Sequence, residues 1–347
     1  MEQERYMDEW LAKKDAYASS INGRKIMFIS GSNTLFGVDT QQIEKALGIP
    51  TVNYGTHAAL YYYTLHRAQK HLHNGDIVIL PLEYSYYDWH HDAFDPELSA
   101  YLLGYAPAEI TKLHLPDKLK FIAQLHTKDL AKFAYQRIIP PAQKESTYSS
   151  QYLNTNGDMT NNHMENRLSD SALMAKISHP VFKEPPLTAD AKAELIDFIN
   201  YCQANNITVY ATWPNFLWPT KEFNGADLDG IHSIEEFYHE HNVEILGKYT
   251  DCLYDVNLFY DTHYHLNEEG KRIHTNYLIN LLKNKLPKQW LYLGGRGLFG
   301  GWNDCRRLAG WQPILDQRMS MCRGNRHNFL SKRPIHTGHL VQPAKQA

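Results

Sequence analysis

The sequence predicts an α/β protein built on a parallel sheet, and three observations favour this class. Short apolar runs alternate with helical patterns along the first 290 residues, which is the order that βαβ units produce. The segment 76–80 contains a continuous apolar run, as is typical of a strand. Hydrophobic residues make up 43% and charged residues 21% of the 347 residues, which excludes a disordered, collagen-like or coiled-coil chain.

The first part of the chain is expected to supply three strands and the helices between them. The strands are expected at residues 25–29, 51–53 and 76–80. An N-terminal helix is expected over residues 1–20. A second helix is expected to begin near Asp39, with Thr40 as an alternative cap, and a third to occupy residues 57–72. Pro81 is expected to end the third strand.

A long insertion, at about residues 94–188, is expected to interrupt this alternation. Residues 94–140 have a helical, amphipathic pattern, and a Ser/Thr/Asn-rich stretch that extends to about residue 162 predicts a surface loop. The alternation then resumes. Its expected elements are a helix at 189–205, a strand at 207–211, a helix at 234–241, a strand at 253–256 and a helix from Asn267 to about Lys285.

The last 57 residues differ from the rest in charge. Residues 291–347 hold 9 Lys and Arg against 2 Asp and Glu, a net charge of +7, whereas residues 1–290 carry −10. Such a tail is either a segment that touches nucleic acid or anionic lipid, or a poorly structured appendage. We favour the appendage, because its basic residues are neither clustered nor interleaved with stacking aromatics, and we expect no nucleic-acid partner. The α/β domain is therefore expected to span residues 21–290.

The compartment is left open by the sequence. No apolar run approaches the ~18 residues of a membrane span. The first ten residues lack the charged start and apolar core of an export signal, so the chain as written is expected to be soluble. Association with a membrane would then require a segment outside this chain. The cysteines have neither a metal-ligand spacing nor the density of a disulfide framework; they are Cys202, Cys252, Cys305 and Cys322.

Polar residues follow the first two predicted strands, where ligands of parallel sheets gather. Ser32 lies between Gly31 and Asn33, directly after the first strand. A serine in that position can expose its hydroxyl at the sheet rim, with backbone N–H groups facing a developing oxyanion. The alternative is a turn serine that bonds its own backbone. Gly55 follows the second strand and would let a substrate approach the backbone, although a plain turn explains it equally well.

An acid and two histidines precede the last predicted helix. Asp261 and His265 have the residue types that an acyl-transfer triad needs, a base for the nucleophile and an acid that orients the base. Helix capping by Asn267 and ordinary surface histidines are the structural alternatives. A metal site on Asp261, His263 and His265 ranks below the triad, because no second cluster of ligands is evident. We expect no metal and no cofactor.

Taken in order, these segments resemble the four blocks of the SGNH/GDSL hydrolases, over about residues 20–285. The matching segments are Phe28-Ile29-Ser30-Gly31-Ser32-Asn33, Asn53-Tyr54-Gly55, Gly75-Asp76-Ile77-Val78-Ile79-Leu80-Pro81 and Asp261 to Gly270. The sequence is most similar to a bacterial branch akin to cell-envelope acyl-transfer and O-acetylation proteins. The resemblance implies a flavodoxin-like three-layer α/β/α sandwich. It also implies that Ser32 is the nucleophile, His265 the base and Asp261 its partner, with Gly55 and the Ser32 N–H as the oxyanion hole.

The sequence departs from the family pattern in three places. Ser30-Gly31-Ser32 stands for Gly-Asp-Ser, and a shifted alignment would put Asn33 at the nucleophile position. One extra residue separates Asp261 from His265. The block that usually reads Gly-x-Asn-Asp is here Pro81-Leu82-Glu83-Tyr84, without the oxyanion-hole Asn. Candidate replacements are the Tyr84 hydroxyl, Glu83 as its orienting partner or as a ligand of a substrate hydroxyl, and Asn215 as another donor.

The substrate class is suggested by the aromatic residues, which form 12% of the chain and include 23 Tyr. Several lie near the predicted strand ends and would suit sugar rings, although core packing accounts for at least half of them. Two hypotheses follow. One is an esterase or acyltransferase acting on an acylated sugar or cell-envelope glycan; the other is a non-catalytic SGNH-like domain that binds a glycan or a partner.

Overall fold

Five parallel strands form the central sheet of the structure, a computed structural model. They are β1 (Ile26–Ser30), β2 (Thr51–Gly55), β3 (Ile77–Leu80), β4 (Thr208–Thr212) and β6 (Glu244–Leu246). Their order is β2-β1-β3-β4-β6, and every neighbouring pair is parallel. This is the flavodoxin-like order, in which the chain reverses its direction of travel across the sheet between β1 and β3. The predicted α/β class with a parallel sheet is confirmed.

The structure describes most of the chain before residue 287. The described residues are 2–91, 96–112, 115–125, 135, 146–177, 180–183, 185–220 and 222–286. The predicted tail at 291–347 and part of the predicted insertion lie outside these residues.

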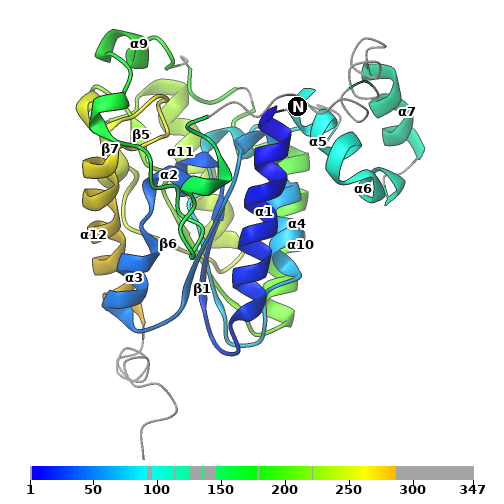
Figure 1. The fold of residues 1–347 in the computed structure, drawn as a ribbon, viewed down its shortest axis with the longest axis horizontal. Coiled ribbons are helices and arrows are strands. Elements are labelled where there is room, and N and C mark those ends of the chain that lie inside the picture. The colour runs from blue at the N-terminus through cyan, green and yellow to red at the C-terminus, as the bar shows by residue number, and fades with distance from the viewer. Residues whose placement is uncertain are drawn as a thin grey trace, which may run out of the picture. The chain divides into compact units, whose positions relative to one another are not determined.

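Helices cover both faces of the sheet, because side chains alternate along each strand. On β1, Met27 and Ile29 face one core cluster, whereas Ile26 and Phe28 face the other. The first cluster contains residues of α1 (Glu2–Ser20), α4 (Tyr61–Gln69), α10 (Ala189–Ala204) and α11 (Gly225–Glu240). The second contains residues of α3 (Thr40–Leu47) and α12 (Glu268–Lys285). The result is three layers, with α3 and α12 on the opposite side from α1, α4 and α10 (Figure 1).

The remaining elements are short and gather mostly at the carboxyl ends of the strands (Figure 1). The helices are α2 (Ser32–Gly37), α5 (Pro96–Tyr105), α6 (Pro107–Lys112), α7 (Leu115–Gln124) and α9 (Asp170–Met174). A separate two-stranded parallel pair consists of β5 (Phe216–Leu217) and β7 (Leu253–Tyr254). Short 3₁₀ turns occupy residues 58–60, 84–86, 150–152, 164–166, 249–252 and 256–258.

Side-chain caps fix the starts of the long helices where the sequence predicts them. Asp39 accepts a hydrogen bond from the N–H of Gln42 at 2.8 Å, and Asn267 accepts one from Gly270 at 3.0 Å. Thr188 caps α10 in the same way. These caps satisfy N–H groups that have no partner inside the helix. The predicted helix starts near Asp39, at residue 189 and at residue 267 are therefore confirmed to within a residue.

Two predicted elements differ from the observed ones. The predicted strand at 253–256 is β7, which pairs with β5 outside the main sheet, and the fifth strand of the sheet is β6. Only Leu246 of β6 is buried, so this strand lacks the apolar run that marks the others. The helix predicted at 234–241 begins earlier, at Gly225. Gly230 obscures its first half in the sequence, but the missing side chain there leaves room for Phe182.

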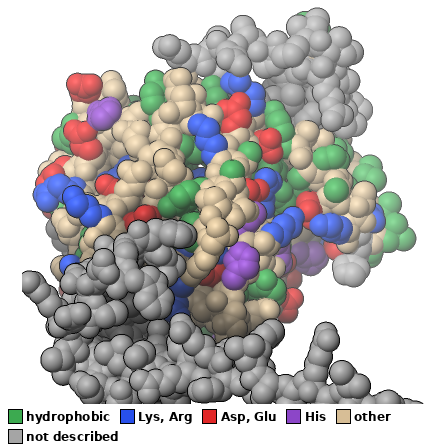
Figure 2. All heavy atoms as spheres, turned by 60° about the horizontal axis from the view of Figure 1, so that its bottom comes forward, with side chains coloured by type: hydrophobic (Ala, Val, Ile, Leu, Met, Phe, Trp, Pro, Cys, Tyr) green, Lys and Arg blue, Asp and Glu red, His purple; other side chains and the backbone are tan. Residues whose placement is uncertain are grey.

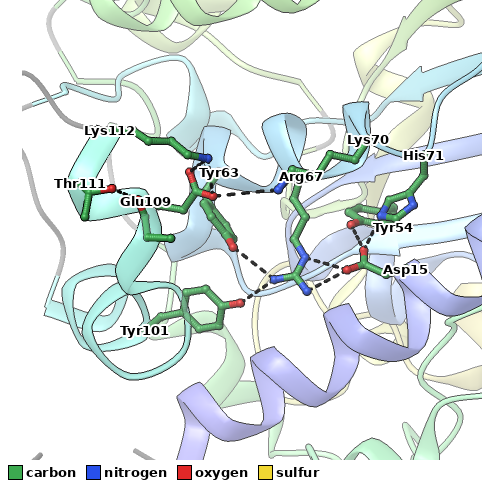
Figure 3. Close-up of polar contacts among 11 residues, drawn as sticks. Asp15, Tyr54, Tyr63, Arg67, Lys70, His71, Tyr101, Glu109, Thr111 and Lys112 are labelled. Carbon is green, nitrogen blue, oxygen red and sulfur yellow. Dashed lines mark hydrogen bonds and ion pairs between the residues drawn. The ribbon is translucent and has the colours of Figure 1, made fainter.

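The insertion is attached to the domain by a polar cluster around Arg67 (Figure 3). From α4, Arg67 donates to the Asp15 carboxylate of α1, through Nε at 3.0 Å and Nη2 at 2.8 Å. Its Nη1 donates to the hydroxyls of Tyr63 at 3.2 Å and Tyr101 at 3.0 Å. Because Tyr101 belongs to α5, this one side chain joins the insertion to two helices of the sandwich.

The end of the insertion returns to the sheet edge through buried ionic groups. The Asp158 carboxylate accepts from the backbone N–H and hydroxyl of Thr40, at 3.0 and 2.7 Å, and from Asn53. The fully buried Lys14 donates to the carbonyls of Asn53 at 2.8 Å and Gly157 at 2.5 Å. These contacts hold the segment that leads to the candidate site described below.

The surface seen in Figure 2 carries acidic and basic side chains side by side. Lys and Arg are scattered among Asp and Glu on this side of the described residues, and they form no large patch of one sign. Within the part of the chain that the structure describes, no helix is both long and apolar enough to cross a membrane.

Candidate active site

A pocket of about 760 Å³ opens at the carboxyl ends of β1 and β3. This is the point where the strand order reverses, and ligands of open α/β sheets bind there. The pocket is lined by Tyr6, Trp10, Ser32, Leu35, Phe36, His57, Glu83, Ser85, Ser146, Tyr148, Thr262, His263, Tyr264 and His265. Its residues come from α1, from both strand ends, from the insertion and from the loop before α12. The pocket is thus formed by residues that lie far apart in the sequence.

Ser32 is the first residue of α2, which follows β1 after a single glycine. The strand end is fixed by its neighbours. Ser30 donates through its hydroxyl to the carbonyl of Pro81 at 2.7 Å, and the Asn33 amide donates to the same carbonyl at 2.7 Å. The Asn33 side chain is fully buried in this contact and does not line the pocket, whereas Ser32 does. The geometry therefore favours Ser32 over Asn33 as the nucleophile.

His265 and Asp261 form the pair that the sequence predicts. Nδ1 of His265 lies 2.7 Å from Oδ1 of Asp261, and the ring stacks on Phe36 with centroids 4.2 Å apart. The Tyr148 hydroxyl donates to the other carboxylate oxygen at 2.5 Å. Burial opposes ionisation of Asp261, but the charge and hydrogen bond of His265 and the bond from Tyr148 outweigh it and lower its pKa. Asp261 therefore stays ionised and can orient the imidazole.

The turn that carries His265 is closed by Thr262. Its hydroxyl oxygen accepts from the backbone N–H of His265 at 3.1 Å and from that of Tyr264 at 3.2 Å. The extra residue between Asp261 and His265 is accommodated in this turn, since the carboxylate still reaches the ring. The longer spacing does not separate the pair.

Glu83 lies at the centre of the site, at the end of β3. Its Oε1 accepts from the hydroxyl of Ser32 at 3.1 Å and from the backbone N–H of Asn33 at 2.9 Å. Burial raises the pKa of this carboxyl, although the Asn33 N–H, the charge of His265 and the bonds from Ser32 act against the shift. Glu83 is therefore a buried acid in direct contact with the candidate nucleophile.

Ser32 and His265, the candidate nucleophile and base, line the same pocket. Among the described residues, the Ser32 hydroxyl donates to Glu83, and no hydrogen bond joins it to His265. Activation of Ser32 by His265 would require the hydroxyl to turn away from Glu83 toward the imidazole. Catalytic hydrogen bonds are often longer or absent in a protein without its substrate, so the geometry is compatible with either a resting enzyme or a binding domain.

The structure does not bring Tyr84 or Asn215 to the pocket. The ring of Tyr84 is buried among Phe182, Phe216 and Phe223, and its hydroxyl makes no hydrogen bond within the described residues. Its backbone N–H donates instead to the Tyr264 hydroxyl at 3.0 Å. The Asn215 amide donates to the Tyr264 carbonyl at 2.6 Å. Both residues hold the turn before His265 and present no donor to a substrate, because a packed core surrounds each side chain.

Gly55 does not line the pocket either. Its backbone N–H donates to Oδ1 of Asn53 at 3.0 Å, so this predicted oxyanion donor is engaged inside the domain. A Cβ at this position would lie 2.5 Å from the backbone N of Leu35. The glycine thus allows β2 and α2 to approach closely, which is a packing role.

Two aromatic residues of the pocket, Trp10 and Tyr148, have no signal in the sequence. Trp10 lies in the N-terminal helix and donates through Nε1 to the carbonyl of Tyr148 at 3.1 Å. Tyr148 comes from the insertion, 113 residues before the Asp261 that it contacts. His263 lines the pocket, and burial and the nearby charge of His265 lower its pKa to about 4. In the described ranges, no group of His, Cys, Asp and Glu is arranged to hold a metal ion.

Comparisons with known proteins assign no family. No protein-family model matches the chain, and no curated protein matches it. Among solved structures, the crystal structure of protein YxiM from Bacillus subtilis is similar at 9% sequence identity and a TM-score of 0.34. The alignment covers 76% of this chain and 57% of that one, so this chain spans a little over half of the other protein. Similarity at this level carries no argument about the site.

Proposed function

We propose that this protein is an acyl-ester hydrolase or acyltransferase that acts through Ser32, His265 and Asp261. One observation carries the proposal: the His265 ring, 2.7 Å from the Asp261 carboxylate, lines the same pocket as a serine at the carboxyl end of β1. A nucleophile, a base and an orienting acid are the groups that acyl transfer needs.

The reaction would proceed in two balanced steps. Nε2 of His265 takes the proton of the Ser32 hydroxyl while Oγ bonds to the acyl carbon, and the alcohol of the ester leaves with that proton. Water, or the hydroxyl of an acceptor, then attacks the acyl carbon and passes its proton to His265. The bond between the acyl carbon and Oγ breaks, and His265 returns the proton to Ser32. Both outcomes share the acyl-enzyme, so hydrolysis and transfer differ only in which hydroxyl attacks.

A carbohydrate or cell-envelope ester is the proposed substrate. The pocket wall contains aromatic side chains that suit the C–H faces of a sugar, among them Tyr6, Trp10 and Tyr148. His57 also lines the pocket and is a candidate partner for sugar hydroxyls. The cell-envelope assignment rests on the family resemblance of the sequence.

The second candidate is a glycan- or partner-binding domain without catalysis. It is favoured by the hydrogen bond from Ser32 to Glu83, which leaves the serine turned from its base. A domain that only binds a glycan would need the aromatic side chains of the pocket but not the Asp261–His265 pair.

Turnover of acetylated sugars and of p-nitrophenyl acetate tests the proposal. Ser32→Ala should abolish turnover, whereas Ser85→Ala, which removes another hydroxyl from the same pocket, should retain most of it. Sugar binding without turnover in the unaltered protein, or equal turnover in the two variants, would favour the binding domain.

A further inference from the structure

The Glu83 carboxyl lies beside the hydroxyl of Ser32, the proposed nucleophile. Its Oε1 is 3.1 Å from Oγ of Ser32 and 2.9 Å from the backbone N of Asn33, and the Ser32 N–H also donates to this carboxyl. The chain makes room for it with Gly31, where a Cβ would lie 2.5 Å from Oε1. Only 3% of Glu83 is exposed, so water does not screen the carboxyl from its neighbours.

An ionised carboxylate in this position would oppose acyl transfer. When Ser32 is acylated, the new bond joins Oγ to the acyl carbon. The oxyanion is then two bonds away from Oγ, an atom that lies 3.1 Å from Oε1 of Glu83 in the structure. An oxyanion is stabilised by donors about 2.7–3.1 Å away. A carboxylate repels it and occupies the N–H groups of Ser32 and Asn33 that would otherwise serve as donors.

We propose that Glu83 reacts as a neutral carboxylic acid, whose O–H donates to the oxyanion on the Ser32 adduct, and that its ionised form holds the site at rest. This inference rests on the proposed function. It gives the acid at the end of β3 a direct part in the chemistry, as a catalytic residue that contacts the reacting atoms.

The surroundings of Glu83 favour the neutral form. The ionisable groups that act on it or respond to it are His265, Tyr86 and Tyr264. Burial raises the pKa of both tyrosines well above the usual value, so their rings are neutral. A protonated His265 favours the ionised carboxyl; a neutral His265, which is the form that acts as a base, removes that attraction. Burial, which raises the pKa of Glu83, then meets less opposition.

The proton balance of the step is complete within the protein. The Ser32 proton moves to Nε2 of His265, the Oγ–C bond forms, and the carbonyl π electrons move to oxygen. Glu83 donates a hydrogen bond to that oxygen and keeps its proton. When the oxyanion collapses, the alcohol leaves with the proton from His265, and Glu83 is unchanged.

Two substitutions at Glu83 show whether its carboxyl donates a hydrogen bond to the oxyanion or only obstructs the site. Glu83→Gln keeps the shape and an N–H donor but carries no charge, whereas Glu83→Met removes both the charge and the donor. Acylation by p-nitrophenyl acetate is measured from pH 5 to 9, with thermal melting to show that each variant folds. Glu194→Gln, which alters an acid paired with His66 outside this pocket, is the matched control.

Three results are expected. The rate of the unaltered protein falls by about tenfold per pH unit as Glu83 ionises. Glu83→Gln loses this fall, so at high pH it is faster than the unaltered protein. Glu83→Met is slower than Glu83→Gln by on the order of 10²–10³-fold, the usual cost of one oxyanion donor.

Other results overturn the inference in distinguishable ways. If Glu83→Gln loses activity at every pH, Glu83 acts in its ionised form, as a base for Ser32. If Glu83→Met is as fast as Glu83→Gln, the carboxyl only obstructs the site. If Ser32→Ala in the Glu83→Gln background reacts at the same rate, the reaction does not occur at Ser32 and the proposed function itself fails.

Discussion

At the scale of single residues, the Asp261–His265 pair is the feature that most resembles catalytic machinery. The ring is held on three sides, by the carboxylate at 2.7 Å, by Phe36 stacked at 4.2 Å and by the edge of Tyr148. An imidazole fixed in this way has one tautomer, with Nε2 left to accept a proton. Such positioning is more than a surface histidine needs.

Removal of this pair should abolish turnover. We expect His265→Ala and Asp261→Asn each to lower kcat by on the order of 10³–10⁴-fold, because both the base and its tautomer depend on the contact. Activity of the unaltered protein should also fall in acid, since a protonated imidazole accepts no proton. His263→Ala is the control, because burial already keeps that ring neutral with a pKa of about 4. An essential His263 beside a dispensable His265 would contradict the assignment.

Tyr148 should have a smaller, measurable effect. Tyr148→Phe removes the hydroxyl that donates to Asp261 at 2.5 Å but retains the ring against His265. A hydrogen bond to a charged group contributes about 1.5–3 kcal/mol, so we expect kcat to fall by roughly tenfold or more with little change in KM. Tyr152→Phe, in the same segment, is a suitable control. An unchanged kcat for Tyr148→Phe would show that the Asp261 carboxylate needs no second partner.

The sequence identifies these residues by their positions next to predicted strands and helices, but it does not indicate which side chains they contact. Ser32 follows an apolar strand and His265 precedes a capped helix, so local pattern indicates both. The contacts of Glu83 with Ser32 and of Tyr148 with Asp261 join residues 51 and 113 positions apart, and depend on which elements become neighbours. For the same reason the sequence offers Tyr84 and Asn215 as donors, although the core around them turns both side chains away.

At the scale of elements, the close approach of β2 and α2 positions Ser32. It depends on Gly55, whose missing side chain leaves room for the backbone of Leu35. The same absence of a side chain at Gly31 admits the Glu83 carboxyl. Gly31 and Gly55 thus determine how Ser32 lies between the second strand and the end of the third.

Gly55→Ala should destabilise the domain. The added Cβ would lie 2.5 Å from the Leu35 nitrogen and 2.8 Å from Cβ of Thr34, so the start of α2 must shift. Overpacking of this kind typically costs about 1–3 kcal/mol. Gly23→Ala, where no atom lies within 4 Å of the added carbon, should be close to neutral. Denaturant unfolding compares the two, and equal free energies of unfolding would contradict the packing role.

Strand prediction succeeds here for β1 to β4 and fails for β6. Every residue of β1, β2 and β3 is buried, and the apolar runs of β1 and β3 are visible in the sequence. In β6 one residue of three is buried, so its membership of the sheet depends on pairing with β4. The apolar residues of β7 pair with β5 instead, a choice that no local pattern encodes.

At the scale of the whole molecule, the sandwich closes before the basic tail begins. The five strands and the helices on both faces lie within residues 2–286. Among the described helices, α12 is the last in sequence, and it packs on the sheet. The alternation of apolar and helical segments predicts this layering, because every strand needs a helix to cover each face. The polar chemistry gathers at one end of the sheet, and it is the chain reversal between β1 and β3 that creates the pocket there.

Deletion of residues 291–347 should leave the domain intact. We expect an unchanged thermal midpoint and unchanged turnover of p-nitrophenyl acetate, because the five strands of the described sheet all lie within residues 26–246. Limited proteolysis of the full chain provides a second measurement, with early cleavage expected at Arg296, Arg306 or Arg307. Loss of cooperative melting in the shortened chain would show that the domain boundary lies further toward the C-terminus.

Covalent labelling of Ser32 tests the central claim most directly. A fluorophosphonate probe bonds to a serine whose hydroxyl is activated by a base, and mass spectrometry of the digested protein identifies the labelled residue. We predict one labelled peptide, containing Ser32, which is lost in Ser32→Ala, strongly reduced in His265→Ala and retained in Ser85→Ala. Absence of labelling at high probe excess in the folded protein, or labelling that persists in Ser32→Ala, would contradict it.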